Sequence, residues 1–207
     1  MDLAKIYDRQ FFAKHQPWRS EYDAISDALI KLIDFSSVLD LGCGNGFFLD
    51  RFQKRGKRVR GVDGSVHALS AAPAAVRPKL AVADLTAPLR LGRYDLVVCS
   101  EVAEHLDARH ADTLVDTICA NAGQWVFFTA ATPGQIGVHH VNGQPHAYWT
   151  AKFEHRGFQL DTEATDRLRQ HLAKVISIIW WFKKNAMILR APADAPHAAA
   201  KRAAPPD

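Results

Sequence analysis

The sequence predicts a doubly wound α/β fold, in which a mostly parallel sheet carries helices on both of its faces. Short apolar runs typical of strands alternate along the chain with amphipathic segments typical of helices. The first of these runs, Val38–Leu41, precedes three glycines at alternate positions, Gly42, Gly44 and Gly46. Glycines let the backbone turn tightly and approach a ligand, so this stretch predicts a strand, a binding turn and the start of a helix.

The composition is that of one ordinary globular domain. The chain has 207 residues, of which 48% are hydrophobic and 23% are charged. We expect residues 1–190 to form this domain, with N-terminal helices over residues 1–34. The Ala- and Pro-rich residues 191–207 are expected to be disordered. The net charge of +4 is too small to indicate a nucleic-acid partner.

No segment of the sequence indicates export or membrane insertion. The N-terminal residues lack the apolar core of a signal peptide. The longest apolar run, Val175–Phe182, is far shorter than the ~20 residues of a membrane span. Cys43, Cys99 and Cys119 are odd in number, which favours reduced thiols over a disulfide framework. The sequence therefore predicts a cytoplasmic protein with no membrane partner.

The N-terminal half contains the first three predicted strands. A short amphipathic helix that carries Tyr7 and Phe11 comes first, either as a lid over a pocket or as a helix packed on the sheet edge. A second helix is expected from Ser20 to Ile33. The periodicity then predicts strands at Val38–Leu41, Val59–Val62 and Leu80–Ala83, and helices at Phe47–Arg55 and His67–Ala75.

The C-terminal half supplies four more predicted strands and one long loop. The strands are Tyr94–Cys99, Trp125–Ala130, Phe158–Leu160 and Ala186–Leu189. The helices are 108–121, Tyr148–His155 and a long one from Asp166 to about Lys183. The loop between Ala131 and His146 is rich in Pro, Gly and His and is too long for a plain connector. We therefore expect it to have a functional role.

Carboxylates at the ends of the predicted strands indicate what the sheet binds, because ligands of parallel sheets lie beyond those ends. Asp63 suits the two hydroxyls of a ribose. A nicotinamide-binding turn needs its third glycine one residue after Gly46, where Phe47 stands. A phosphate-binding loop needs a Gly-Lys-Ser/Thr that this turn lacks. The turn alone does not choose between a dinucleotide and another adenosine-bearing cofactor.

Four motifs in register resemble those of class I S-adenosylmethionine-dependent methyltransferases. They are Asp40–Gly46, Gly61–Gly64, Ala83–Leu85 and Tyr94–Leu106. The loop Thr129–Asn142, followed by Tyr148 and Trp149, looks like that of a subgroup of small bacterial methyltransferases. The resemblance implies a Rossmann-like, seven-stranded sheet. Its last strand, Asn185–Leu189, would be antiparallel and inserted between strands five and six.

The resemblance also implies which residues bind S-adenosylmethionine, whose product is S-adenosylhomocysteine. The methionine part would lie at the glycine turn and after strand four, the ribose after strand two and the adenine after strand three. In chain order these positions are Asp40, Gly42, Cys43 and Gly44; Asp63 and Gly64; Asp84 and Leu85; and Ser100 and Glu101. Acidic side chains suit this cofactor, which has a cationic centre, two ribose hydroxyls and no phosphate.

Histidines are the candidates for acid–base chemistry, because imidazole titrates near neutral pH. His139, His140 and His146 lie on the loop expected beside the cofactor, and we predict a base among them, with His140 first; the alternative is that they cap the loop. His105 follows Glu101 by four residues and would share a helical face with it, as a second base or as a structural pair. The loop histidines lack a familiar ligand spacing, so no metal site is predicted.

The predicted function is methyl transfer to the hydroxyl of a small molecule or a sugar, by in-line displacement with a histidine base. No Asn/Asp-Pro-Pro-Tyr/Phe follows the fourth strand, where Ser100 and Glu101 stand, so the chain does not resemble enzymes that methylate DNA amino groups. Two alternatives stay open: methylation of an amine or carboxyl group of a small metabolite, and a catalytically silent, cofactor-binding partner subunit. The sequence leaves the oligomeric state open.

Overall fold

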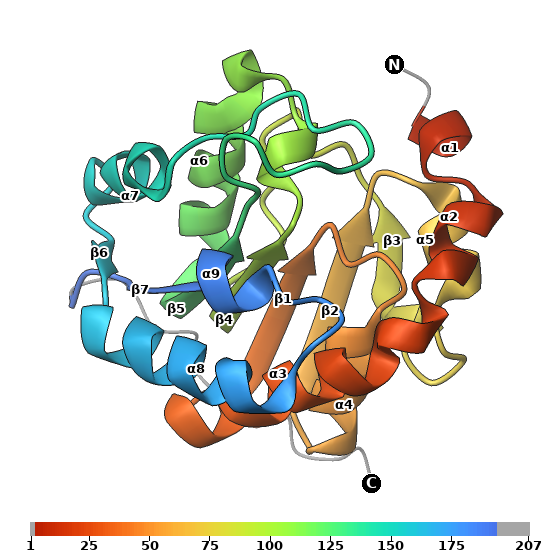
Figure 1. Ribbon diagram of the computed structural model, residues 1–207, viewed down its shortest axis with the longest axis horizontal. Helices are drawn as coiled ribbons and strands as arrows, with labels where there is room; N and C mark the ends of the chain where they lie inside the picture. The colour runs from red at the N-terminus through yellow and green to blue at the C-terminus, as the bar shows by residue number, and fades with distance from the viewer. Residues whose placement is uncertain (1–2, 194–207) are drawn as a thin grey trace, which may run out of the picture.

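A computed structural model describes residues 3–193 of the chain. These residues form a seven-stranded sheet with helices on both faces (Figure 1). Disorder is predicted for residues 191–207. Of these, residues 194–207 lie outside the described part of the chain. Within the described part of the chain, no helix has both the length and the apolar character to cross a membrane.

The sheet has the strand order β3-β2-β1-β4-β5-β7-β6. Its first five strands pair in parallel, and β7 is antiparallel to both of its neighbours, which confirms the predicted class of fold. The strands are β1 Ser37–Leu41, β2 Arg58–Asp63, β3 Leu80–Val82, β4 Tyr94–Ser100, β5 Ala122–Thr129, β6 Gln159–Leu160 and β7 Met187–Arg190.

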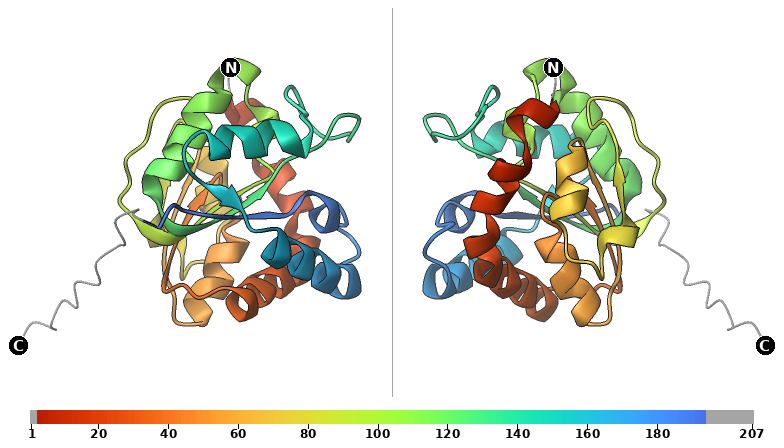
Figure 2. Two further views of the ribbon diagram at one scale, coloured as in Figure 1. Left: turned by 90° about the vertical axis from the view of Figure 1, so that its left-hand side faces the viewer. Right: turned by 90° about the vertical axis from the view of Figure 1, so that its right-hand side faces the viewer.

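The helices divide between the two faces of the sheet, as both views of Figure 2 show. One face carries α3 Arg19–Leu32, α4 Phe47–Lys54, α8 Thr162–Val175 and α9 Phe182–Asn185, and the other carries α6 Ala111–Asn121 and α7 His146–Glu154. Three further helices are short and come from the N-terminal part of the sequence: α1 Leu3–Ile6, α2 Arg9–Lys14 and α5 Val66–Ala71. The 3-10 turns are η1 Gln16–Trp18, η2 Arg77–Lys79, η3 Ala103–His105 and η4 Ala108–His110.

Successive side chains of a strand point to opposite faces of the sheet. The apolar side chains of the central strands therefore form one core on each face. In β4, Leu96 and Val98 belong to the core beneath α3, α4 and α8, whereas Val97 and Cys99 belong to the core beneath α6 and α7. Both faces of β4 are therefore covered, which explains why this strand is a continuous apolar run in the sequence.

The prediction of one long helix from Asp166 to Lys183 was wrong. The helix α8 begins earlier, because the carboxylate of Asp161 caps it by accepting from the N–H of Ala164 at 2.9 Å. It ends at Val175, and the chain returns to helix only at α9. The ends of this helix are thus set by two carboxylates, one local and one distant in the sequence.

The distant carboxylate belongs to Glu21 on α3. It accepts hydrogen bonds from the backbone N–H groups of Ser177, Ile178 and Ile179 at 2.7, 2.8 and 2.8 Å. Burial alone raises the pKa of Glu21, but these N–H groups outweigh burial and the pKa is lowered. The carboxylate therefore stabilises the segment between α8 and α9 in a non-helical conformation.

The N-terminal aromatic segment forms two short helices instead of one. The chain breaks between α1 and α2, where the side chain of Asp8 accepts from the N–H of Phe11 at 2.8 Å and caps α2. The helix α2 lies beside α5 near the edge strand β3 (Figures 1 and 2). This position agrees with the sheet-edge alternative.

Replacement of Glu21 by glutamine is expected to lower the free energy of unfolding by about 2 kcal/mol at pH 7, because charged acceptors of buried N–H groups are replaced by a neutral amide. The lowered pKa means that this contribution is present above the usual value of 4.5 and is lost as the pH falls through the folded-state pKa. Urea unfolding of both proteins at pH 7 and in acid measures it.

The matched control is Glu163→Gln on α8, whose side chain is 84% exposed. This change is expected to alter the free energy of unfolding by no more than about 0.5 kcal/mol at either pH. Equal effects of the two substitutions at pH 7 would show that Glu21 does not hold the segment between α8 and α9.

Candidate functional site

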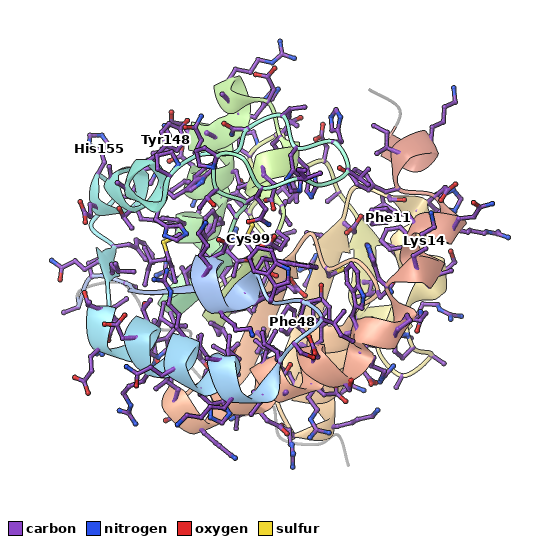
Figure 3. The ribbon with its side chains drawn as sticks, viewed as in Figure 1. Phe11, Lys14, Phe48, Cys99, Tyr148 and His155 are labelled. Atoms are coloured by element: carbon purple, nitrogen blue, oxygen red, sulfur yellow. The ribbon has the colours of Figure 1, made fainter. Side chains whose placement is uncertain are left out.

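A cavity of about 980 Å³ opens at the carboxyl ends of β1, β2 and β4. Its wall includes every residue for which the sequence analysis predicts a role in cofactor binding: Asp40, Gly42, Cys43, Gly44, Asp63, Gly64, Asp84, Leu85, Ser100 and Glu101. Figure 3 shows Cys99, at the end of β4, and Phe48, on α4, near the centre of the molecule, while Lys14 and His155 lie at its periphery. The strand ends therefore meet around one space.

The glycine turn that follows β1 requires glycine for two reasons. Gly42, Gly44 and Gly46 all have positive φ, at 79°, 48° and 63°. At Gly42 a Cβ atom would also lie only 2.3 Å from Cγ2 of Val102. The turn is tied to β2, because the N–H groups of Gly42 and Cys43 donate to the carbonyl of Val62 at 2.8 and 3.0 Å.

The carboxylate of Asp63 closes the turn from the other side. Its Oδ2 accepts from the N–H of Gly44 at 2.9 Å, and its Oδ1 accepts from the N–H of Ser65 at 2.8 Å. The hydroxyl of Ser65 donates to the carbonyl of Tyr7 at 2.7 Å, which links the end of β2 to the N-terminal segment. Asp63 thus shapes the cavity wall, and each of its oxygens retains a lone pair for a further donor.

Two buried carboxylates bring unsatisfied oxygen atoms to the wall. Oδ2 of Asp40 and Oε1 of Glu101 are buried and have no hydrogen-bond partner among the residues that the structure describes. Burial, followed by the charge of Asp63, raises the pKa of Asp40 well above its usual range. Buried acceptors without donors are costly, so these atoms indicate a cationic or donor-rich ligand.

Glu101 stands at a strained point of the backbone. Its φ is 54°, a left-handed conformation that non-glycine residues rarely adopt, and its N–H donates to the carbonyl and the hydroxyl of Thr129, each at 3.0 Å. This conformation ends β4, and a 3-10 turn, η3, follows. The predicted helical face shared by Glu101 and His105 was therefore wrong, because no α-helix runs between them.

Asp84 lies at the outer end of the wall. Its Oδ1 accepts from the N–H and the hydroxyl of Thr86 at 2.8 and 2.7 Å. These hydrogen bonds lower the pKa of Asp84. The carboxyl group is therefore held in its ionised, hydrogen-bond-accepting form beside Leu85.

Of the candidate histidines, His105 and His140 line the cavity, whereas His139 and His146 do not. The rings of His105 and His140 are in edge contact, with centroids 5.0 Å apart and planes at 66°. Nδ1 of His105 lies 3.2 Å from the carbonyl of His139, and Nδ1 of His140 lies 2.9 Å from the carbonyl of Gln135. Carbonyls only accept, so both rings carry their proton on Nδ1 and a lone pair on Nε2. Burial lowers the pKa of His105 to about 4.

His139 does not lie on the cavity wall. Its φ of 57° turns the loop, and its carbonyl orients the ring of His105. His139 therefore supports the loop and the ring of His105, which agrees with the alternative to a base for the loop histidines.

Sequence reasoning missed Glu104, which lies beneath the two rings. The residue is fully buried; Oε1 accepts from the N–H of Ala131 at 3.1 Å, while Oε2 is without a partner in the described part of the chain. Burial and the charge of Glu101 raise the pKa of Glu104 well above its usual range. The signal in the sequence is its position directly before His105, which is far from the loop histidines along the chain.

Aromatic side chains form the far side of the cavity. This aromatic rim consists of Tyr7, Phe11, Trp18, Trp180 and Trp181. The rings of Trp18 and Trp181 are in edge contact at 5.5 Å, and those of Tyr7 and His105 at 5.6 Å. The break between α8 and α9 brings the two C-terminal tryptophans to this rim, so the incorrect prediction of a continuous helix also concealed their role. The aromatic N-terminal segment lines the pocket as well as packing at the sheet edge.

Comparison with known proteins places the chain among methyltransferase domains. A family model described as a methyltransferase domain matches residues 8–182. The ubiquinone biosynthesis O-methyltransferase of Leptothrix cholodnii is 30% identical over 105 residues, which cover 47% of this chain and 45% of that protein. The protein of the same name from Paraburkholderia xenovorans is 32% identical over 100 residues, covering 45% and 43%. The chain thus matches less than half the length of these curated relatives.

Solved structures share the fold at low sequence identity. A magnesium protoporphyrin IX methyltransferase from Synechocystis, with bound S-adenosylhomocysteine, has a TM-score of 0.60 at 17% identity and covers 83% of this chain and 81% of its own. An amino pentose methyltransferase from Micromonospora echinaspora, with bound S-adenosylmethionine, has a TM-score of 0.62 at 15% identity, covering 84% and 91%. These likenesses concern the fold alone.

Replacement of Gly42 by alanine is expected to lower the free energy of unfolding by at least about 2 kcal/mol, through a strained φ and a clash with Val102. Gly56→Ala is the matched control, because Gly56 has a similar φ of 77° and nothing within 4 Å of an added Cβ; about 1 kcal/mol is expected there. Urea unfolding measures both. Equal losses in the free energy of unfolding would show that contact with Val102 does not restrict residue 42.

Proposed function

Because this chain belongs to the methyltransferase-domain family, we propose that it transfers a methyl group from S-adenosylmethionine to a hydroxyl of a small molecule or a sugar. One observation carries the proposal: the strand ends gather an acidic wall around the cavity, and Oδ2 of Asp40 is buried there with no donor among the residues that the structure describes. A positively charged ligand without phosphate satisfies such a wall, whereas a nucleotide phosphate is repelled by it.

The residues of the wall fit the parts of S-adenosylmethionine. Asp40 would accept from the ammonium of its methionine part, with Gly42 and Gly44 allowing the close approach of the ligand. Asp63 would accept from the two ribose hydroxyls with the lone pairs that Gly44 and Ser65 leave free. Asp84 would accept from the amino group of the adenine, beside Leu85. When bound, this cofactor supplies a methyl group on a cationic sulfur that leaves as a neutral thioether.

The protein must then orient the acceptor and receive its proton. In the proposal, Nε2 of His140 accepts the hydroxyl proton, because His140 lines the cavity and the carbonyl of Gln135 holds Nδ1–H, which leaves the lone pair on Nε2; this nitrogen packs beside Gly137. His105 stays neutral next to it, since burial lowers its pKa to about 4. This contact would orient the oxygen of the acceptor toward the methyl group, with the aromatic rim on the far side of the cavity.

The acceptor is proposed to be a small molecule that presents a hydroxyl beside a flat or apolar face. Support comes from the aromatic rim, since tryptophan and phenylalanine pack on sugar faces and aromatic rings. The matching relatives bear the name of O-methyltransferases, which supports oxygen as the methylated atom. Methylation of an amine or carboxyl group, and a silent partner subunit, remain as outcomes of the tests below.

Calorimetric titration with S-adenosylhomocysteine tests the cofactor assignment. One molecule is expected to bind per chain, and a nicotinamide dinucleotide, used as the control ligand, is expected not to bind. Failure of S-adenosylhomocysteine to bind would refute the proposed function. Binding without any methylated product from a metabolite extract would favour the silent partner subunit, and product methylated on nitrogen or a carboxyl group would replace the hydroxyl as acceptor.

Two substitutions should separate cofactor binding from catalysis. Asp63→Ala is expected to weaken S-adenosylhomocysteine binding by about 10- to 100-fold, the loss of one or two charge-assisted hydrogen bonds. His140→Ala is expected to lower turnover by about 100-fold or more and to leave binding nearly unchanged. Calorimetry and initial rates at saturating substrate measure the two quantities. His155→Ala, on the periphery after α7, is the control and should change neither.

The assignment of roles is wrong if both variants retain full turnover and unchanged cofactor affinity. A thermal melt of each variant shows whether the fold is intact, which matters for Asp63 because its carboxylate also holds the glycine turn.

A further inference from the structure

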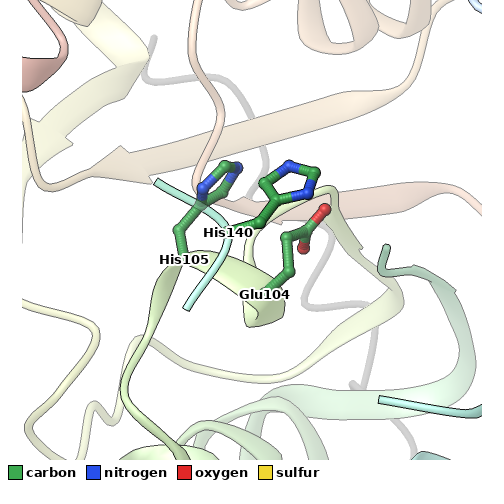
Figure 4. A group of neighbouring side chains, drawn as sticks. All are labelled: Glu104, His105 and His140. Carbon is green, nitrogen blue, oxygen red and sulfur yellow. The ribbon is translucent and has the colours of Figure 1, made fainter. Parts of the chain in front are cut away.

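We propose that Glu104, His105 and His140 form a binding site for one divalent transition-metal cation at the edge of the cavity. Each residue offers one ligand atom, and the three atoms lie within 4.8 Å of one another. Figure 4 shows the carboxyl group of Glu104 beside the ring of His140, with the ring of His105 on the other side of that ring. The inference rests on the proposed function for its catalytic consequence, but not for the site itself.

The backbone holds the three residues in register. Glu104 and His105 are consecutive in η3, directly after β4, and His140 comes from the loop after β5. The loop is tied to η3, because the N–H groups of Val141 and Asn142 both donate to the carbonyl of Glu104 at 2.9 and 3.0 Å. The residue that supplies the carboxylate therefore also fixes the position of the loop histidine.

Both imidazoles are oriented as metal ligands are. A metal-binding histidine donates its second ring N–H to a carbonyl or carboxylate, which sets the tautomer and the direction of the lone pair. His105 makes this contact with the carbonyl of His139 at 3.2 Å, and His140 makes it with the carbonyl of Gln135 at 2.9 Å. In each ring, Nε2 is then the nitrogen whose lone pair remains for a cation.

Glu104 provides independent evidence for a cation. Its side chain is fully buried, and Oε2 receives no N–H or O–H from the described residues, while the buried carboxyl group of Glu101 lies within hydrogen-bonding reach of Glu104, so that two adjacent carboxyl groups share this place. The other oxygen of Glu104 accepts from the N–H of Ala131 at 3.1 Å, which directs the carboxyl group toward the rings. An unpartnered carboxylate oxygen in the interior is unfavourable, and a bound cation removes that penalty.

Two nitrogen ligands and one oxygen ligand suit a first-row transition metal such as zinc. Magnesium and calcium prefer an all-oxygen set. In a tetrahedral zinc site with bonds of about 2.1 Å the ligand atoms are about 3.4 Å apart, so binding draws the three side chains together by up to roughly 1.4 Å. Three protein ligands leave a fourth position open, and His105 and His140 direct that position to the cavity.

A cation at this position changes how the acceptor is activated. It engages the Nε2 lone pair of His140, which then no longer receives a proton, and it lowers the pKa of a hydroxyl that reaches the open position. That hydroxyl releases its proton to solvent, and its oxygen forms the bond to the methyl carbon. The carbon–sulfur bond breaks, and its electron pair stays on the sulfur. In the metal-free protein His140 thus acts as the base, whereas in the metal-loaded protein it is a metal ligand.

Titration of the chelator-treated, full-length chain with zinc tests the site. Calorimetry is expected to show one tightly bound ion per chain. Glu104→Gln, His105→Gln and His140→Gln should each weaken binding by at least about 100-fold, since loss of an outer-shell partner alone costs 10- to 100-fold. His171→Gln, an exposed histidine on α8, is the control and should bind zinc like the wild type. Cobalt absorption without a thiolate band excludes the three cysteines as ligands.

The site is refuted if the wild-type chain binds no zinc or if His140→Gln binds it as tightly as the wild type. S-adenosylhomocysteine binding by each variant confirms that its fold is intact. Zinc binding without S-adenosylhomocysteine binding would remove the proposed function and leave the metal site. Methyl transfer by a chain that binds no zinc would leave the proposed function, with His140 as the base, and remove the metal site.

Discussion

The cofactor side of the cavity depends on the hydrogen bonds that the carboxylate of Asp63 accepts. This carboxylate accepts from Gly44 on one oxygen and from Ser65 on the other, so one side chain joins the glycine turn after β1 to the turn after β2. The left-handed glycines could adopt many conformations without that tie. Ser65 extends the connection to the N-terminal segment through the carbonyl of Tyr7, and this links the aromatic rim to the same strand ends.

Glu21 has the corresponding role on the acceptor side. Its buried carboxylate accepts three consecutive N–H groups and prevents α8 from continuing, which brings Trp180 and Trp181 to the cavity. The protein therefore uses carboxylates in two ways. Those of Asp63 and Glu21 are satisfied by backbone N–H groups and shape the wall, whereas Asp40, Glu101 and Glu104 each have a buried oxygen without a hydrogen-bond partner in the part of the chain that the structure describes.

The sequence predicted the sheet and the cofactor side well, because local pattern determines both. Apolar runs specify buried parallel strands, and a strand followed by spaced glycines specifies a turn with positive φ. It could not predict the break after Val175, since that depends on Glu21, 156 to 158 residues away in the chain. The grouping of Glu104 with His140 was equally invisible, because it arises where two loops from neighbouring strands meet.

The central claim is that the cavity at the ends of β1, β2 and β4 is an S-adenosylmethionine site. A crystal structure of the chain grown with S-adenosylhomocysteine tests it most directly. The account predicts ribose hydroxyls within hydrogen-bonding distance of Asp63, the adenine amino group beside Asp84, and the sulfur facing the side of the cavity that carries His105 and His140. A ligand bound elsewhere, or a ribose that does not contact Asp63, would contradict it.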